Sequence, residues 1–236
     1  MAAYAHEAHE AHEAQEGGKA AFGFIVEATI AKGVVAAIDT AAAEAAPGVV
    51  LVMTHRNAPG QGAWGPLDAK DRFARASPQL ADNRIRHYGQ AVAFVVAESF
   101  EQARSAARLV AVCYQAEPGE FELAPNLIKA EKPGDQFGQK TDSLVGNFPA
   151  AFAAASVSID ESFTTPCHIH AQMEPHATMA YWKCGRVIIH CSAQLLESAQ
   201  KAVADTLQIA PERVRIVSRY VGGGFGGKLP VYGDVM

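Results

Sequence analysis

A glycine-rich loop lies near the end of this sequence: residues 222–227 read Gly-Gly-Gly-Phe-Gly-Gly and follow a β-like run from Val214 to Val221. Glycine permits a sharp turn, or a close approach of the backbone to another group, because it has no Cβ atom. Successive exposed N–H groups in such a turn can hold oxygen anions. The loop therefore predicts a site for a phosphate, a pyrophosphate or a metal-oxo group.

The same loop satisfies the dinucleotide-binding pattern G-x-G-x-x-G through Gly222, Gly224 and Gly227. That chemistry needs a helix that opens at the loop and receives the pyrophosphate, with an acidic residue about 20 positions later. Here Leu229 and a proline follow, and the sequence ends at Met236. A nicotinamide site is therefore disfavoured, and the G-K-[ST] pattern of a P-loop is missing as well.

Three histidines and a carboxylate lie within nine residues upstream of the loop: His168, His170, Glu174 and His176. Imidazole and carboxylate are suitable ligands for zinc or iron. However, His168 and His170 share a face only in an extended segment, and Pro175 moves Glu174 away from helical geometry. Helical zinc signatures are also absent from the sequence. We expect this cluster to pack and hydrogen-bond around a buried turn.

Composition excludes several classes of function. The sequence is 49% hydrophobic and 19% charged, which is typical of a globular protein. The net charge of -5 and the lack of a Lys/Arg cluster argue against nucleic-acid binding. No apolar run reaches the roughly 18–20 residues of a membrane span, and the N-terminus lacks signal-peptide features. The predicted location is cytoplasmic, or periplasmic through co-export with a partner.

The cysteines and the N-terminal segment carry little chemistry. Four widely spaced cysteines show no C-x-x-C pairing, so neither a zinc knuckle nor an iron–sulfur ligand set is indicated. We expect small core residues at Cys113, Cys167, Cys184 and Cys191. The sequence does not decide whether these cysteines form two disulfides. Within the His/Glu/Ala-rich segment 1–19, residues 6–14 repeat His-Glu-Ala with a period of three, which does not give the i, i+4 spacing that chelates a metal. This segment predicts a polar helix or a frayed terminus, with weak nickel or zinc affinity as the alternative.

Hydrophobic patterning divides the remainder into two units. Residues 20–115 predict a compact α+β unit whose strands and helices share one core. Its expected strands are 21–26, 33–38, 49–53, 91–97 and 109–114, and its expected helices are 41–46 and one that begins near Ser99. Ser99 and Gln102 form a capping-box signature. The loop 57–78 is long for a compact domain, so we expect it to be functional or an interface element.

A connector and a second unit follow. Residues 116–155 are rich in proline and glycine and predict an irregular connector with a short helix at 150–155. Residues 156–236 predict the second unit. Its expected elements are an alternating strand at 156–163, a hairpin of 179–182 with 186–191, a helix at 195–207, and the strand that leads into the glycine loop.

Three ordered motifs carry a family resemblance: Met173 to Ala180 (MEPHATMA), Ser192-Ala193-Gln194, and the loop 222–228. Together they resemble the molybdenum-binding subunit of the xanthine dehydrogenase and aldehyde oxidase family, above all the bacterial aldehyde oxidoreductase large subunits. The unit 20–115 resembles that family's a/b hammerhead domain. The implied fold is α+β, with a hammerhead-like domain followed by the first part of a molybdopterin-binding domain.

The resemblance implies a cofactor and the residues that hold it. Gln194 matches the glutamine that reaches an oxygen ligand of molybdenum, and Phe225 with Gly226 matches the loop that lies against the metal. Neither Gln194 nor Phe225 is expected to ligate the molybdenum directly. The implied cofactor is molybdopterin in its cytosine dinucleotide form, bound by Gln194, Gly223, Gly224, Phe225, Gly226 and Gly227. If the Phe225 side chain is buried, its truncation should cost about 3–5 kcal/mol.

The family's reaction is the hydroxylation of aldehydes or N-heterocycles with water as the oxygen source. Electrons pass to a small [2Fe-2S] subunit and an FAD-binding medium subunit. The xanthine-specific members have a glutamate where this chain has Leu229, which favours aldehydes over purines. The family's catalytic glutamate lies beyond residue 236 of the full pattern, so we expect no catalytic residue here and no activity of the isolated chain.

The resemblance covers the N-terminal part of a longer subunit. A split subunit that pairs with a complementary molybdopterin-binding chain, a truncated gene product and a cloned fragment all remain open. The alternative to an enzyme component is a non-catalytic assembly module that uses the hammerhead-like unit to contact partner subunits. The long loop 57–78 motivates this alternative.

Overall fold

The computed structural model describes residues 19–65, 73–135, 138–233 and 235–236. The predictions for the His/Glu/Ala-rich segment therefore lie outside the described residues, apart from Lys19. The first unit contains β1 (Phe22–Glu27), β2 (Gly33–Asp39), α2 (Ala41–Glu44), β3 (Val49–Thr54), β4 (Arg84–Ile85), β5 (Ala91–Ala97), α3 (Phe100–Ala107) and β6 (Ala111–Ala116). The remaining elements are the 3-10 helix η2 (Ala124–Lys129), α4 (Phe148–Ala154), β7 (Met179–Lys183), β8 (Arg186–His190), α5 (Leu196–Leu207), the 3-10 helix η3 (Pro211–Arg213) and β9 (Val214–Val217).

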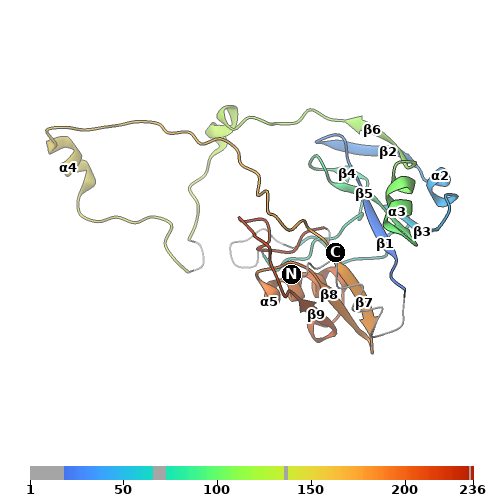
Figure 1. Ribbon diagram of the computed structural model, residues 1–236. Helices are drawn as coiled ribbons and strands as arrows, with labels where there is room; N and C mark the ends of the chain where they lie inside the picture. Colours follow the sequence, from blue (N-terminus) through green and yellow to red (C-terminus); the bar gives the residue numbers. More distant parts are fainter. Residues whose placement is uncertain (1–18, 66–72, 136–137, 234) are drawn as a thin grey trace.

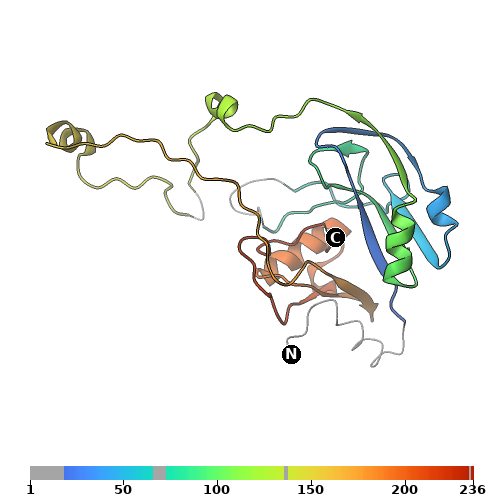
Figure 2. The ribbon, with the colours of Figure 1, turned by 45° about the horizontal axis from the view of Figure 1, so that its top comes forward.

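Two antiparallel three-stranded sheets form the first unit. One has the order β1-β5-β3 and the other β4-β2-β6. The apolar strand β5 lies at the centre of its sheet, and α3 packs against β1 and β5 (Figure 2). Both sheets and both helices contribute to one core, which includes Val35, Ile85, Val95 and Ala106. Burial of these apolar side chains is the main force that holds the sheets together.

Helix α3 begins where the capping signature predicted. The Ser99 side chain accepts a hydrogen bond from the Gln102 N–H at 3.3 Å, which satisfies one of the helix's unpaired N–H groups. Ala103, Ala106 and Ala107 form the buried face. The strand after this helix runs two residues later than predicted, because β6 begins at Ala111 instead of residue 109.

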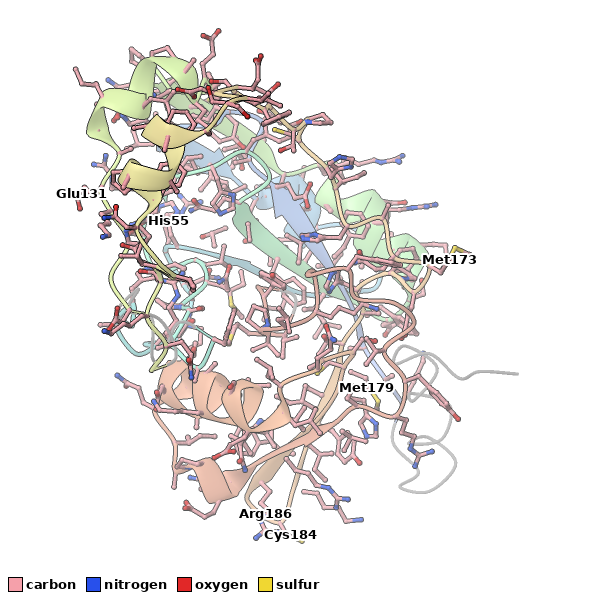
Figure 3. The ribbon with its side chains drawn as sticks, turned by 90° about the vertical axis from the view of Figure 1, so that its left-hand side faces the viewer. His55, Glu131, Met173, Met179, Cys184 and Arg186 are labelled. Carbon is pink, nitrogen blue, oxygen red and sulfur yellow. The ribbon has the colours of Figure 1, made fainter. Side chains whose placement is uncertain are left out.

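The second unit is smaller. Strands β7 and β8 form an antiparallel hairpin, with Cys184 and Arg186 at its turn (Figure 3), and β9 pairs parallel to β8. Helix α5 connects β8 to β9 and packs on β9. Its core includes Val187, Ile189, Val203 and Val214. The predicted hairpin and helix are confirmed, but β9 ends at Val217, four residues before the predicted strand end at Val221.

A long arm joins the two units. Its described residues, 117–135 and 138–178, leave β6, lead away from both units to the short helix α4, and return past the glycine loop to β7 (Figures 1 and 2). The irregular connector and its short helix were predicted, although α4 begins at Phe148, after the Asn147 cap. The predicted strand at 156–163 is wrong: this segment lies in the arm and forms no strand. A strand needs a neighbour to pair with, and the described residues offer it none.

The described parts of the 57–78 loop form an interface between the two units. The Gly62 N–H donates to the Thr206 carbonyl at 2.8 Å, and the Ser77 N–H donates to the Thr206 hydroxyl at 2.9 Å. A Cβ atom on Gly62 would lie 2.2 Å from the Asp205 carbonyl oxygen, so only glycine permits this approach to α5. The loop is therefore an interface element within its own chain.

The cysteine prediction is wrong for three of the four residues. Cys191 is buried, as expected of a core residue, whereas Cys113, Cys167 and Cys184 are exposed. All four lie in described parts of the chain, and none of them forms a disulfide. Local hydrophobicity did not reveal which cysteines face solvent, because Cys184 lies in a turn and Cys167 in the arm.

The described helices of this chain are short. Among the described residues, none combines the length and the apolar composition that crossing a lipid bilayer requires.

Candidate functional site

The glycine loop follows β9 and is built on left-handed backbone geometry. The φ angles of Gly222, Gly223 and Gly226 are +61°, +88° and +91°, and Phe225 also has a positive φ of +48°. The Gly227 N–H donates to the Gly224 carbonyl at 2.7 Å, which closes a tight turn. Turns continue after the loop, and the residues described there contain no helix. The helix that a dinucleotide-binding fold opens at its loop is therefore not found among the residues described here.

The main chain of the loop offers hydrogen-bond donors. Within the part of the chain that the structure describes, the N–H groups from Gly223 to Gly226 donate to no other group. A run of free N–H groups in a turn of glycine residues is suited to an oxygen-rich anion. The loop thus has the donor chemistry that its sequence predicted.

Gln194 lies directly against this loop. Its N–H donates to the Lys228 carbonyl at 2.9 Å, so the main chain before α5 is tied to the end of the loop. Its side chain is exposed, and a Cβ atom on Gly224 would lie 2.5 Å from the Gln194 Oε1 atom. The structure therefore brings together Gln194 and the glycine loop, and it explains why residue 224 has no side chain.

Phe225 is 77% exposed, so the condition behind its expected 3–5 kcal/mol contribution is not met. The side chain does not fix the loop by burial, and it stays available for contact with a ligand or another chain. We expect Phe225→Ala to change the free energy of unfolding by no more than about 0.5 kcal/mol. Urea unfolding would measure this change. As a control, Ile189→Ala in the same unit should cost about 2–5 kcal/mol, because Ile189 is buried.

A buried ion pair anchors both ends of the loop. Lys228 is fully buried, and its Nζ atom lies 3.8 Å from Oε2 of Glu174, which is 1% exposed. The Lys228 ammonium donates to the Val221 carbonyl at 2.5 Å and to the Glu174 carbonyl at 3.0 Å. The Ser192 hydroxyl donates to Glu174 Oε1 at 2.7 Å. Buried charges require such partners, and these contacts hold the residues immediately before and after the glycine loop.

The segment around Glu174 also contacts the start of the glycine loop. The Glu174 N–H donates to the Gly222 carbonyl at 3.2 Å. A Cβ atom on Gly222 would lie 2.3 Å from the Glu174 Cβ atom, so the two segments are in close contact. Figure 3 shows Met173 and Met179 at the two ends of this segment, and Met179 is the first residue of β7. Residues 173–179 are therefore part of the loop's support.

The prediction that the three histidines pack around a buried turn is wrong: all three are exposed, and only Glu174 of the predicted cluster is buried. The His170 ring lies against Gly227, where a Cβ atom would approach the ring to 2.9 Å. The His176 ring packs edge-on against Tyr232 with 6.0 Å between centroids. His168 is exposed in the arm, and Glu174 is held by Lys228 and Ser192. In the described ranges, no three His, Cys, Asp or Glu side chains gather as a metal site would require.

A cavity of about 1000 Å³ lies between the two units, beside the loop. Gly227, His170 and His176 line one side, and Asp82 and Arg86 line the other. The Arg86 guanidinium donates to the Asp82 carboxylate at 2.6 Å, and this hydrogen bond lowers the pKa of Asp82. The volume is in the range of small-molecule sites. The cavity reaches the loop at Gly227, whereas Gln194 and residues 222–226 do not line it.

Sequence reasoning missed Lys228 and Ser192 as anchors. Their partner Glu174 lies 54 positions before Lys228 and 18 before Ser192. No local pattern reports a pair so far apart. The one available signal was a lysine directly after the glycines without the Ser/Thr of a P-loop, which left its role unexplained.

Two family models together match most of the chain. The model described as "Aldehyde oxidase and xanthine dehydrogenase, a/b hammerhead domain" matches residues 10–118. The model described as "Molybdopterin cofactor-binding domain" matches residues 128–236. The predicted fold class, an α+β hammerhead-like domain followed by part of a molybdopterin-binding domain, is confirmed by these matches and by the structure. The exact domain boundaries stay a prediction.

Curated relatives include molybdenum-binding subunits. The chain is 43% identical over 217 residues to the aldehyde oxidoreductase molybdenum-binding subunit PaoC of Escherichia coli K12, which covers 92% of this chain and 28% of that protein. It is 31% identical to the putative xanthine dehydrogenase molybdenum-binding subunit XdhA of the same organism, over 89% of this chain and 29% of XdhA. The chain thus spans less than a third of the length of these relatives.

Solved structures share the fold. Quinoline 2-oxidoreductase from Pseudomonas putida 86 matches 89% of this chain and 28% of its own, with a TM-score of 0.70 and 24% identity. The aldehyde oxidoreductase from Desulfovibrio gigas matches 83% of this chain and 23% of its own, with a TM-score of 0.65 and 23% identity. At these identities the likeness shows the fold alone.

Proposed function

Because the chain belongs to the molybdenum-binding subunits of the xanthine dehydrogenase and aldehyde oxidase family, we propose that its glycine loop and Gln194 form one wall of a molybdopterin site. The observation that carries this proposal is the exposed Gln194 amide beside a loop with free N–H groups from Gly223 to Gly226. These are neutral donors, preorganised by a buried anchor.

The residues present fit such a cofactor. Molybdopterin carries phosphate and metal-bound oxygen atoms, which accept hydrogen bonds from main-chain N–H groups and from a side-chain amide. Lys228 is buried and paired with Glu174, so the loop acts through dipoles instead of an exposed positive charge. The residues that would hold the cofactor are Gln194, Gly223, Gly224, Phe225, Gly226 and Gly227. When bound, the molybdenum centre supplies the redox chemistry, and this chain orients it.

We propose that the chain serves a molybdenum hydroxylase for aldehydes or N-heterocycles, with water as the oxygen source. Leu229 after Lys228 favours aldehydes over purines, since a purine-binding glutamate is missing at that position. A cytosine dinucleotide form of the cofactor, a [2Fe-2S] partner and an FAD partner complete the proposal. The chain itself contributes no catalytic residue: Glu174 is the buried acid beside the loop, and Lys228 and Ser192 hold it in a structural role.

Metal content tests the proposal. The chain would be purified alone and with a complementary molybdopterin-binding chain, and molybdenum would be measured by elemental analysis. We expect molybdenum only in the complex, because the loop is one wall of the site. Stoichiometric molybdenum in the isolated chain would contradict the proposal that the site needs residues from outside this chain. Lack of molybdenum in both samples would contradict the cofactor assignment.

A non-catalytic assembly module is the second candidate. The long loop 57–78 motivated it, but the described parts of that loop contact α5 of the same chain through Gly62 and Ser77. This contact accounts for the loop without a partner subunit. The cofactor proposal is therefore the better supported of the two.

A further inference from the structure

We propose that Ser192 is a positioning residue for the candidate cofactor site. Its hydroxyl contacts the buried pair of Glu174 and Lys228, and this contact sets where the Gln194 amide lies relative to the glycine loop. The role rests on the proposed function, because Gln194 and the loop are the two parts of the proposed site. It gives the buried polar groups a task beyond the stability of the second unit.

The segment between β8 and α5, residues 191–194, is held to the sheet by its main chain. The Cys191 N–H donates to the Val217 carbonyl at 3.1 Å. The Ala193 N–H donates to the Ser218 hydroxyl at 3.1 Å. Both hydrogen bonds lead to the end of β9, so they fix the segment against the sheet but not against the glycine loop.

Two further contacts of the same segment lead to the loop. The Gln194 N–H donates to the Lys228 carbonyl at 2.9 Å, and the Ser192 hydroxyl donates to Glu174 Oε1 at 2.7 Å. The Glu174 carboxylate in turn faces the Lys228 ammonium, and the Glu174 N–H donates to the Gly222 carbonyl. Glu174 therefore lies between the segment that carries Gln194 and both ends of the glycine loop.

Burial gives the Ser192 contact a narrow geometry. Ser192, Glu174 and Lys228 are all buried. A hydrogen bond to an ionised acceptor is shorter and stronger than a neutral one, and the low dielectric of the interior strengthens it further. The charge of Glu174 is already offset by Lys228, so the Ser192 hydroxyl adds little charge compensation. Its main contribution is the fixed distance between residue 192 and the carboxylate.

A small displacement of this segment matters at Gln194. The Gln194 side chain is exposed, so burial does not hold it, and its position follows from that of its main chain. A Cβ atom on Gly224 would lie 2.5 Å from Gln194 Oε1, so the amide already lies close against the loop. Groups that orient a metal centre have to be held within about 0.5 Å of their working positions. Ser192 supplies this constraint two residues before the amide.

Two serine truncations in the same neighbourhood test the role in the complex with the complementary molybdopterin-binding chain. We expect Ser192→Ala to lower kcat about tenfold and to change KM less than about twofold. Ser218→Ala is the matched control, because it removes a hydrogen bond of the same segment that leads to β9. This control should change kcat less than about twofold. Ser192→Thr keeps the hydroxyl and should retain at least about half of the kcat.

A double variant tests whether Ser192 acts through Gln194. In the background of Gln194→Ala, the further substitution Ser192→Ala should lower kcat less than about twofold, because the group that Ser192 positions is already absent. A full additional tenfold loss would overturn the role. Should Ser192→Ala fail to fold, Ser192→Cys takes its place with the same expected order of kcat values, since a thiol is a weaker donor than a hydroxyl.

Hydrogen exchange of the full 236-residue chain without cofactor gives a readout that does not depend on turnover. The Gln194 amide donates to the Lys228 carbonyl, so its exchange rate reports whether the segment still lies against the end of the loop. We expect this amide to exchange at least about fivefold faster in Ser192→Ala than in Ser218→Ala. Amides of β5 in the first unit serve as the reference and should not change. Equal exchange at Gln194 in the two variants would overturn the role.

The outcomes distinguish this role from the cofactor proposal. Equal kcat values for Ser192→Ala and Ser218→Ala in a molybdenum-loaded complex would overturn the role of Ser192 and leave the cofactor site standing. Lack of molybdenum in the complex of the unaltered chain would instead contradict the cofactor proposal, and the role of Ser192 at that site with it.

Discussion

Replacing Lys228 with methionine should lower the free energy of unfolding of the second unit by about 3–5 kcal/mol. Methionine fills a similar volume, but it leaves the Glu174 carboxylate buried without its cation. It also removes the donor to the Val221 and Glu174 carbonyls. The effect is large because the Ser192 hydroxyl, which still donates to Glu174 Oε1, does not replace the lost positive charge.

Urea unfolding followed by Trp182 fluorescence would measure this loss. Trp182 lies on β7 of the second unit, and a Trp64→Phe background removes the other tryptophan. Lys201→Met is the matched control, because Lys201 forms an exposed i, i+4 pair with Asp205. This control should lose less than about 1 kcal/mol. A Lys228→Met/Glu174→Gln double variant should recover part of the loss, since it removes both charges. Equal losses at Lys228 and Lys201 would refute the role of the buried pair.

Local patterns predicted most of the first unit. The strands β1, β2, β3 and β5 follow short apolar runs between turn residues, and such runs carry their own signal. The Ser99 cap was visible for the same reason, because a cap and its partner lie three residues apart. Where the residues in contact are close together in the sequence, rules that apply to a single segment were sufficient to predict the structure.

The strand at 156–163 shows where local patterns fail. Its alternation satisfies the strand rule, yet a strand exists only when another strand pairs with it. The arm runs apart from both units, so the same residues are irregular here. The alternating pattern is compatible with a strand, but the strand forms only when another strand pairs with it.

Part of the candidate site was predicted from the sequence and part was not. The family resemblance predicted that Gln194 and the glycine loop lie together. In the structure the Gln194 side chain lies against Gly224. The anchor of Lys228, Glu174 and Ser192 was not predictable, because its members are scattered over 55 residues and a buried ion pair has no sequence signature. The burial of Phe225 could be stated only as a condition for a related reason, since hydrophobicity does not say which side of a loop faces solvent.

Gln194→Ala should slow turnover of the reconstituted molybdenum-loaded complex by about 10–100-fold, the usual range for groups that orient a metal centre. The fold should lose no more than about 1 kcal/mol, because the contact to the Lys228 carbonyl uses the Gln194 main chain, which alanine keeps. Steady-state kinetics would measure the first effect, and thermal unfolding of the isolated chain would measure the second.

Gly224→Ala provides an independent test of the same geometry. Its Cβ atom would lie 2.5 Å from Gln194 Oε1, at the far end of a flexible side chain, so the amide would move while the fold adapts. We expect Gly224→Ala to reproduce most of the Gln194→Ala loss of turnover. Combining the two substitutions should add little, because both remove the same donor. Gln115→Ala, at an exposed position of β6, serves as the control for a glutamine truncation elsewhere and should leave turnover unchanged. Full turnover in Gln194→Ala would remove Gln194 from the site, whereas a loss that adds fully to that of Gly224→Ala would mean that the loop glycine acts through something other than the amide.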